Sequence, residues 1–190
     1  MRSIRKIPKI HFCLASEIAD PELKYQLNRT ASVAFGHGEE YPNEYVSGAS
    51  VNGGYVAYIL TSDMKVASVG FGNPTASTLS NGTTVGESTY WLHTFGTLEE
   101  YRGQGFCVAL IKKFIQKMGS KHILYLTVRT EGGNENYRAI KCYTKCGFTM
   151  LPEVYRDHYD GRNTAMVRLP KSKMQRKKPK TKRRKRTSKR

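Results

Sequence analysis

Residues 89–118 constrain the fold more than any other segment, because three kinds of local structure follow one another there. Thr89–Thr97 predicts a strand, and Arg102-Gly-Gln-Gly105 predicts a turn, since glycine relaxes the steric restriction on φ. Apolar residues then recur at spacings of three and four from Cys107 to Met118, which is typical of one helical face. A strand, a glycine turn and a helix start together form a place where helix N–H groups can bind phosphate oxygens.

Strands and helices alternate along the rest of the chain. Further strands are expected at residues 10–14, 55–60, 65–71, 123–128, 155–158 and 164–169. Helices are expected at residues 20–34, opened by Asp20-Pro21, and at residues 136–146, ended by Gly147. Residues 36–54 and 72–86 are expected to be loops. This order predicts an α/β (α+β) fold around a mixed sheet.

Two segments carry a resemblance to a known enzyme family. Arg102-Gly-Gln-Gly-Phe-Cys107 resembles the loop that binds the acetyl-CoA pyrophosphate in the GNAT superfamily of N-acetyltransferases. Cys107 stands where glycine or alanine is usual, and Glu99 stands where a proline is common. The second signature of the family is similar to Asn136, Ala139 and Tyr143 followed by Gly147-Phe148. Two motifs in the right order, with a strand between them, are far more specific than either alone.

The resemblance implies a fold and a co-substrate. The expected fold is a single GNAT-like domain over residues 1–170, with a mixed central sheet of six to seven strands flanked by about four helices. The expected co-substrate is acetyl-CoA. Its diphosphate would lie against the loop residues Arg102, Gly103, Gln104, Gly105, Phe106 and Cys107. Backbone groups near Phe95 and Thr97 would bind the acyl-pantetheine portion.

The resemblance also implies roles for residues of the second motif. Asn136, Ala139 and Tyr143 are spaced to share one helical face, and in the family this face lies along the pantetheine arm. Ala139 would be small enough to admit the cofactor. Tyr143 would be the general acid that protonates the leaving thiolate.

The general base stays open between three alternatives. Trp91, His93, Phe95 and Thr97 alternate, so they are expected to face the same side of their strand. His93 occupies a position similar to a catalytic histidine of arylalkylamine acetyltransferases, and the ordinary histidine pKa near 6.5 suits proton removal. Glu87, just before this strand, is the second candidate. A water chain without a single base is the third.

The expected function is transfer of an acetyl group from acetyl-CoA to a primary amine by direct attack. The acceptor is either a protein lysine, such as one in a histone tail, or a small amine or polyamine. The alternative is a catalytically inactive GNAT-like module that binds nucleic acid through a basic tail. No metal site is expected, because no His or Cys cluster completes the four cysteines, which are read as reduced structural thiols.

Positive charge is concentrated at the C-terminus. The formal net charge is +17, and residues 171–190 contain thirteen Lys or Arg and no Asp or Glu, which leaves +4 for residues 1–170. Such a segment is expected to be disordered. Its clusters resemble nuclear localisation signals, which predicts a nuclear import receptor as a partner; non-specific nucleic acid, an anionic membrane surface and a solvated tail without function stay open as alternatives. With no signal peptide core and no apolar run of membrane length, the chain is expected to be soluble and nuclear or otherwise cytoplasmic; its oligomeric state is left open.

Overall fold

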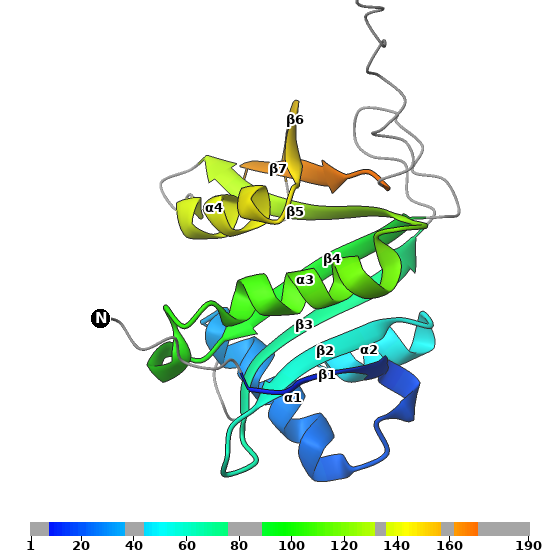
Figure 1. Ribbon diagram of the computed structural model, residues 1–190, viewed down its shortest axis with the longest axis vertical. Coiled ribbons are helices and arrows are strands. Elements are labelled where there is room, and N and C mark those ends of the chain that lie inside the picture. Colours follow the sequence, from blue (N-terminus) through cyan, green and yellow to red (C-terminus); the bar gives the residue numbers. More distant parts are fainter. Residues whose placement is uncertain (1–7, 37–43, 76–88, 132–135, 157–161, 171–190) are drawn as a thin grey trace, which may run out of the picture.

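The computed structural model describes residues 8–36, 44–75, 89–131, 136–156 and 162–170. Its helices are α1 (Pro21–Ala34), α2 (Tyr45–Val51), α3 (Phe106–Met118) and α4 (Tyr137–Lys145), with short 3₁₀ turns at Ala15–Glu17 and Glu99–Tyr101. Its strands are β1 (Ile10–Leu14), β2 (Tyr55–Leu60), β3 (Val66–Thr75), β4 (Thr89–Thr97), β5 (Ile123–Glu131), β6 (Thr149–Arg156) and β7 (Arg162–Arg168). Figure 1 shows these elements in one sheet with helices on both faces.

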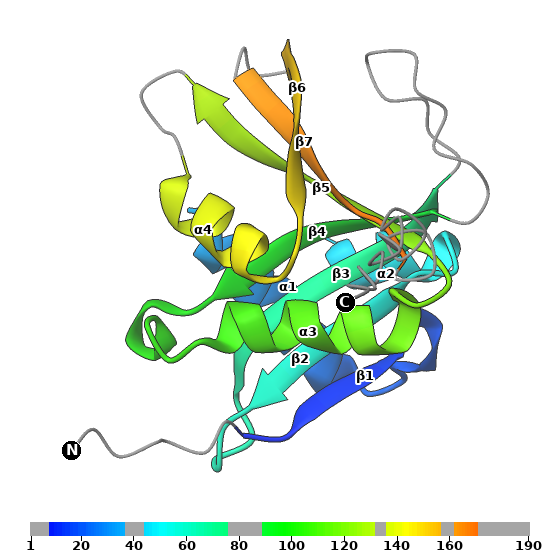
Figure 2. The same ribbon diagram turned by 45° about the horizontal axis from the view of Figure 1, so that its top comes forward.

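The sheet has the order β1-β2-β3-β4-β5-β7-β6. β4 and β5 pair in parallel, and every other neighbouring pair is antiparallel. The parallel pair requires a crossover, which α3 supplies (Figure 2). The expectation of a mixed sheet of six to seven strands with about four helices is therefore confirmed within the described residues. No helix there combines the length and apolar character needed to cross a bilayer.

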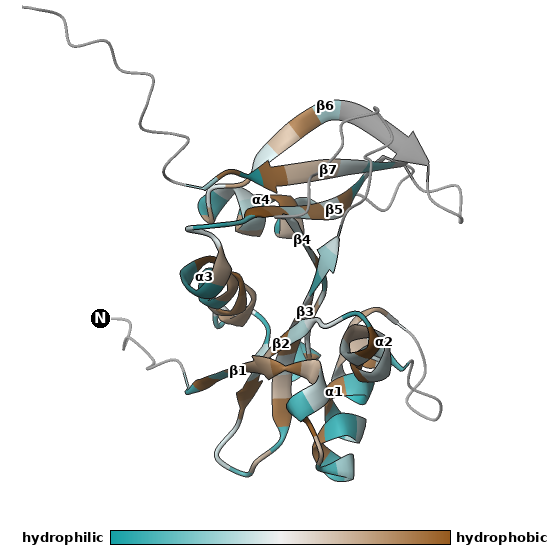
Figure 3. Cartoon of the chain, turned by 90° about the vertical axis from the view of Figure 1, so that its right-hand side faces the viewer, coloured by the Kyte–Doolittle hydropathy of each residue, from teal (hydrophilic) through white to brown (hydrophobic). Residues whose placement is uncertain are grey.

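Two hydrophobic cores lie on the two faces of the sheet. The α3-side core is built around Leu92, Leu110, Phe114 and Tyr143. The α1-side core is built around Leu27, Ala31, Val46 and Phe71. Figure 3 shows α3 on one side of strands β2 and β3, with α1 and α2 on the other. The sheet is thus covered on both faces, and its side chains alternate between two cores.

Helix α2 contradicts the expectation that residues 36–54 are loop throughout. It has only seven residues, which is too short to show a clear helical period. Its buried face consists of Val46 and Ala49, and the Val46 N–H donates to the Asn28 Oδ1 atom of α1 at 2.9 Å. A tertiary hydrogen bond therefore supports a helix that local sequence does not predict.

Several strand bounds also differ from expectation. β3 continues to Thr75 and β5 to Glu131, each beyond its predicted end, and β6 begins at Thr149 instead of residue 155. The extra residues are held by register with neighbours, since Thr75 pairs with Thr89 and Thr149 with Val167. Cross-strand pairing thus extends strands past the point where propensity alone predicts their ends.

An additional residue in β4 changes which face its side chains reach. Phe71 pairs with His93, but Val69 pairs with Gly96, so two steps along β3 match three along β4. Thr94 has a φ of 53°, which is the local distortion that accommodates this β-bulge. His93 stacks on Phe71 of the α1-side core, at 5.8 Å between ring centroids. Phe95 packs instead against Phe114 of α3, at 5.9 Å.

The expectation that Trp91, His93, Phe95 and Thr97 all face one side is therefore wrong at Phe95, and also at Thr97, which follows it by two positions and whose Oγ1 atom lies 2.8 Å from the Ser68 Oγ atom of β3. Trp91 and His93 do share a face, because their rings stack with centroids 4.5 Å apart. The bulge then reverses the alternation before Phe95. Opposite the bulge, a Cβ atom on Gly70 would lie 2.4 Å from the Phe95 ring, so the glycine leaves room for this side chain.

Close contact between β4 and α1 generates a stability prediction. A Cβ atom added at Gly96 would lie 2.8 Å from the Ala34 Cβ atom and 3.3 Å from the Thr30 carbonyl oxygen. Gly96→Ala should therefore lower the free energy of unfolding by about 1–3 kcal/mol, measured by urea denaturation.

The matched control for this substitution is Gly48→Ala, because Gly48 is helical and a Cβ there meets nothing within 4 Å. That variant should gain about 0.5–1 kcal/mol, since alanine has the better helix propensity. Equal effects of the two substitutions would contradict the close packing of α1 on β4.

Candidate active site

The parallel ladder between β4 and β5 is short. It consists of Thr89 with Ile123, Tyr90 with Leu124 and Trp91 with Tyr125. β4 continues to Thr97 and β5 to Glu131 without further pairing to each other, and Figure 1 shows the two strands diverging. Backbone groups of β4 beyond Trp91 are therefore directed toward the space between the strands. Extended backbone at such an opening can hydrogen-bond a linear amide-containing ligand in the way that a strand would.

The glycine loop lies at the end of β4 and begins α3. Gly103 and Gly105 have φ values of 77° and 82°, a left-handed conformation that favours glycine. A Cβ atom at either glycine would meet nothing within 4 Å, so the space outside the loop is open. Gly105 is the N-cap of α3 and offers no side chain, which leaves the first helical N–H groups without a side-chain cap. This geometry fits a diphosphate.

The other loop residues have separate roles. Arg102 is exposed, and its Nε–H donates to the Thr97 carbonyl oxygen at 3.3 Å, which ties the loop to the end of β4. Phe106 is 5% exposed and belongs to the α3-side core. Any contact of Phe106 with a ligand would therefore use its backbone. Gln104 and Cys107 are half-buried, so both reach the border between the core and the open space.

The acid candidate Tyr143 lies beside Phe95. The two rings meet edge to face with centroids 6.5 Å apart, and Tyr143 is 8% exposed. Burial, together with the neighbouring thiols of Cys107 and Cys142, raises the pKa of Tyr143 well above its usual range. The hydroxyl therefore stays protonated at neutral pH, as a proton donor must.

The structure separates the three residues of the second motif. Ala139 is half-buried and packs against the α3-side core, the same core that contains Tyr143. Asn136 is exposed and is the N-cap of α4, where its Oδ1 atom accepts the Ala139 N–H at 3.0 Å. Ala139 and Tyr143 thus face inward together, whereas the observed contact of Asn136 is the helix cap.

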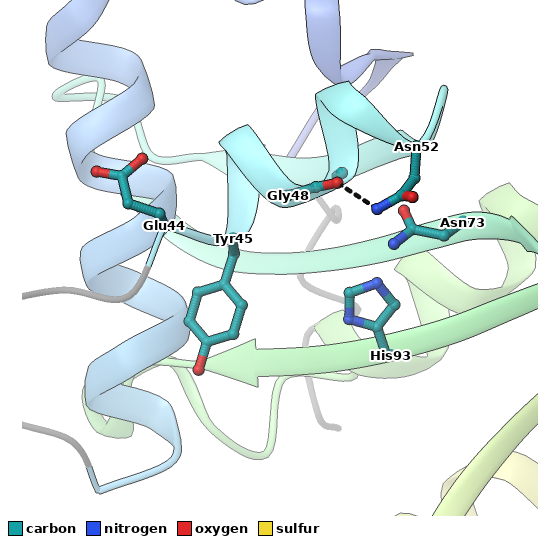
Figure 4. A pocket seen from close by; sticks show the side chains of 7 residues that line it. Glu44, Tyr45, Gly48, Asn52, Asn73 and His93 are labelled. Atoms are coloured by element: carbon teal, nitrogen blue, oxygen red, sulfur yellow. Dashed lines mark hydrogen bonds between the residues drawn. The ribbon is translucent and has the colours of Figure 1, made fainter.

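A pocket of about 300 Å³ lies on the opposite face of β4. It is lined by Glu44, Tyr45, Gly48, Ala49, Asn52, Asn73 and His93. Figure 4 shows the His93 ring rising from β4 toward α2, with Asn73 beside it. The His93 Nε2 and Asn73 Oδ1 atoms are buried and have no hydrogen-bond partner among the described residues. Buried polar atoms of this kind are costly unless a ligand or water satisfies them, which makes the pocket a candidate binding site.

His93 has a defined protonation state in this pocket. Burial lowers the pKa of its imidazole to about 4, so the ring is neutral at pH 7. The Nδ1 atom lies 2.9 Å from Thr94 Oγ1. When Nδ1–H donates to that hydroxyl, Nε2 keeps a free lone pair directed at the pocket. The pKa is thus lower than the ordinary value near 6.5 assumed from the sequence.

The pocket contains residues that sequence analysis did not single out. Glu44, Asn52 and Asn73 had no motif, and α2 was expected to be loop. No sequence signal identified Asn73, because it follows the predicted end of its strand; the structure extends β3 to Thr75 and pairs Asn73 with Trp91. The second base candidate, Glu87, and the basic segment 171–190 lie outside the described residues.

Comparisons with known proteins agree with this geometry. The model of the acetyltransferase (GNAT) family matches residues 14–148, which is more than half of the chain. Escherichia coli ElaA superimposes with a TM-score of 0.62 at 16% identity, covering 84% of this chain and 98% of its own. Arabidopsis thaliana NAA60 in complex with a bisubstrate analogue gives 0.62 at 17% identity, with 86% and 99% covered.

A third solved structure, an acyl-CoA N-acyltransferase from Pseudomonas aeruginosa, gives a TM-score of 0.61 at 18% identity, with 85% and 99% covered. At such identities the likeness shows the fold, and no curated protein sequence matches the chain. The match to the family model, on a chain whose glycine loop and diverging strands fit the co-substrate, shows that this protein belongs to the GNAT family and is an acetyltransferase that uses acetyl-CoA.

Proposed function

We propose that the protein transfers the acetyl group directly to a primary amine that enters through the α2-side pocket. The observation that carries this proposal is the bulge in β4, which directs His93 to one face and Phe95, beside Tyr143, to the other. A thioester held along β4 would then lie between a proton acceptor and a proton donor. This is the arrangement that direct attack requires.

The pocket chemistry supports an amine as the acceptor. The His93 Nε2 atom, which is buried without a partner among the described residues, is able to accept a hydrogen bond, and a primary amine is rich in donors. Glu44 at the rim adds negative charge, although its carboxylate already accepts the Ser47 hydroxyl at 2.6 Å and lies 4.0 Å from the Lys24 ammonium. The amine of a protein lysine and that of a small amine or polyamine meet the same groups, so both remain acceptor classes of the proposal.

Each group has one task in the proposed reaction. The amine must be neutral to attack the thioester carbonyl carbon. As the C–N bond forms, the amine nitrogen loses its basicity and His93 Nε2 accepts the surplus proton. The C–S bond breaks, and the Tyr143 hydroxyl donates a proton to the leaving sulfur. The first N–H groups of α3 and the Gly103–Gly105 backbone hold the diphosphate, so the chain supplies positioning as well as proton transfer.

The C-terminal segment is not part of this chemistry. Nuclear localisation, import receptors and nucleic acid binding, predicted from residues 171–190, stay predictions because that segment lies outside the described residues. The alternative of an inactive nucleic-acid module also loses support, since the family match and the fit of the glycine loop favour an enzyme.

The test of the proposed function is acetyl-CoA consumption by the purified chain against histone-tail peptides, spermidine, putrescine, tryptamine and no acceptor. We expect selective turnover on one amine class. Tyr143→Phe should lower kcat about 100-fold or more, with acetyl-CoA affinity within twofold of wild type, because only the proton donor is lost. Tyr58→Phe, a buried tyrosine of β2, is the control and should keep full kcat. Unchanged turnover in Tyr143→Phe would remove Tyr143 as the acid.

The glycine loop generates a binding prediction. Gly105→Glu should weaken acetyl-CoA binding at least 100-fold in calorimetry, because it places bulk and negative charge where the diphosphate is proposed to lie. Gly53→Glu is the matched control. Gly53 also has a positive φ, 62°, and open space around its Cβ position, so it shares the backbone strain but lies in the turn before β2. Equal affinities of the two variants would place the diphosphate elsewhere.

The neutral state of His93 generates a pH prediction. Because its pKa is about 4 in the folded chain and about 6.5 when unfolded, the unfolded state binds the proton first as pH falls. The free energy of unfolding is therefore unaffected by His93 protonation above pH 6.5. As the pH falls from 6.5 to 4, it decreases by up to about 3 kcal/mol because the unfolded state binds the proton more tightly. In urea unfolding at pH 7 and pH 4, His93→Gln should lack this loss.

The same variant tests catalysis. His93→Gln should lower kcat/KM about 100-fold, whereas His11→Gln on β1 should leave it unchanged. A wild-type kcat/KM profile that loses activity with an enzyme pKa near 6.5 would show that His93 is not the buried neutral base proposed. If the free energy of unfolding fell equally from pH 7 to pH 4 in wild type and His93→Gln, burial of His93 would not oppose its protonation.

A further inference from the structure

Three thiols gather where α3 meets α4. Cys107 lies in the first turn of α3, while Cys142 and Cys146 lie one turn apart at α4. The Sγ atoms of Cys107 and Cys142 are 3.1 Å apart, and Cys146 shares a hydrogen bond with Cys142. All three are free thiols. They do not form a metal site, since no group of metal-ligating side chains is present in the described part of the chain.

One pair in this cluster has the geometry for a covalent bond. The Cys107–Cys142 separation is only about 1 Å longer than a disulfide bond of about 2.05 Å. The two residues come from different helices, so small shifts of the two side chains can bring the sulfurs together. Cys146 instead follows Cys142 by four positions on one helical face, and its contact is with Cys142. The favoured pair is therefore Cys107 with Cys142.

We propose that Cys107 and Cys142 form an oxidation site, at which a hydroperoxide oxidises the two thiols to a disulfide. This disulfide links α3 to α4 and weakens acetyl-CoA binding. The effect on binding rests on the proposed position of the diphosphate at the start of α3. The formation of the disulfide does not.

The chemistry balances with one hydroperoxide per disulfide. The Cys107 sulfur, as thiolate, attacks a peroxide oxygen; an S–O bond forms, the O–O bond breaks, and the leaving oxygen takes up a proton. The Cys142 sulfur then attacks the Cys107 sulfenic acid; the S–S bond forms, the S–O bond breaks, and water leaves with the Cys142 proton. Two thiols are oxidised by two electrons and the peroxide is reduced.

The two cysteines differ in a way that matches these steps. Cys107 lies in the first turn of α3, where unpaired N–H groups favour negative charge on a nearby atom. Its hydrogen bond with Cys142 is the main cause that raises the pKa of the Cys142 thiol to about 12. Cys142 therefore stays a thiol near neutral pH, and its place within 3.1 Å of the Cys107 sulfur, rather than its pKa, makes it the resolving partner.

A disulfide here changes the cofactor site from both sides. The Cys107 N–H belongs to the helix start that would hold the diphosphate, and Cys142 directly precedes Tyr143. Drawing the sulfurs together fixes α4 against the first turn of α3. The proposed pantetheine arm leaves the diphosphate beside these two elements, so a cross-link that removes their freedom to adjust would oppose its entry. Bound acetyl-CoA should in turn shield the two thiols.

The experiment uses the full chain, reduced and then treated with hydrogen peroxide. Peptide mapping by mass spectrometry should find one Cys107–Cys142 disulfide. Calorimetry should show acetyl-CoA binding at least tenfold weaker after oxidation, with recovery on adding dithiothreitol. Cys107→Ala and Cys142→Ala should each abolish the disulfide and the oxidative loss of affinity. Cys13→Ala and Cys146→Ala, which leave the pair intact, should behave as wild type. Coenzyme A added before the peroxide should slow disulfide formation.

Three results would overturn the proposal. The first is a map without the Cys107–Cys142 disulfide. The second is a disulfide with unchanged acetyl-CoA affinity. The third is an oxidative loss of affinity that persists in Cys107→Ala. Failure of the proposed cofactor site is recognised separately, because the reduced wild type would then bind acetyl-CoA no better than Gly105→Glu. The peptide map would still show whether the Cys107–Cys142 disulfide forms.

Discussion

The single extra residue in β4 is the constraint on which the site depends. In a regular strand, His93 and Phe95 would face one core, and His93, the proposed proton acceptor, would lie on the same side of the sheet as Tyr143, the proposed proton donor that contacts Phe95. The bulge sends the imidazole toward α2 and the phenyl ring toward Tyr143. It costs about 1–3 kcal/mol to hold Thr94 at positive φ, and the contact of its hydroxyl with His93 Nδ1 at 2.9 Å offsets part of this.

The short β4–β5 ladder complements the bulge. Three residue pairs join β4 to β5, and α3 connects the two strands. The strands can therefore diverge at one end while the sheet stays continuous at the other. The opening begins just after Trp91, two residues before the bulge reverses the strand. At its far end, Gly103 and Gly105 turn the chain into α3 and leave helix N–H groups open. Backbone geometry thus provides an extended surface and the proposed diphosphate site along one path, and the side chains of the proposal serve the amine and proton transfer.

Much of this arrangement was predictable because it depends on local rules. The glycine turn, the periodic face of α3 and the Asn136 cap are short-range signals, and β4 has the bounds expected from its sequence. Helix α2 and the bulge were not predictable in the same way. α2 depends on the hydrogen bond from Val46 N–H to Asn28, eighteen residues away, and the bulge depends on the register with β3. The depressed pKa of His93 follows from burial in a pocket that α2 completes, so it could not be assigned before α2 was known.

The contact between Gly70 and Phe95 has a consequence for how this protein can diverge. A Cβ atom at position 70 would lie 2.4 Å from the Phe95 ring, so the two positions share one volume on neighbouring strands. Homologues that gain a side chain at 70 are expected to carry a smaller residue at 95, and the two positions should covary across an alignment. Since Phe95 contacts Tyr143, such an exchange would also move the tyrosine, so a substitution at position 70 of β3 would alter the proposed proton donor although Gly70 itself carries no side chain.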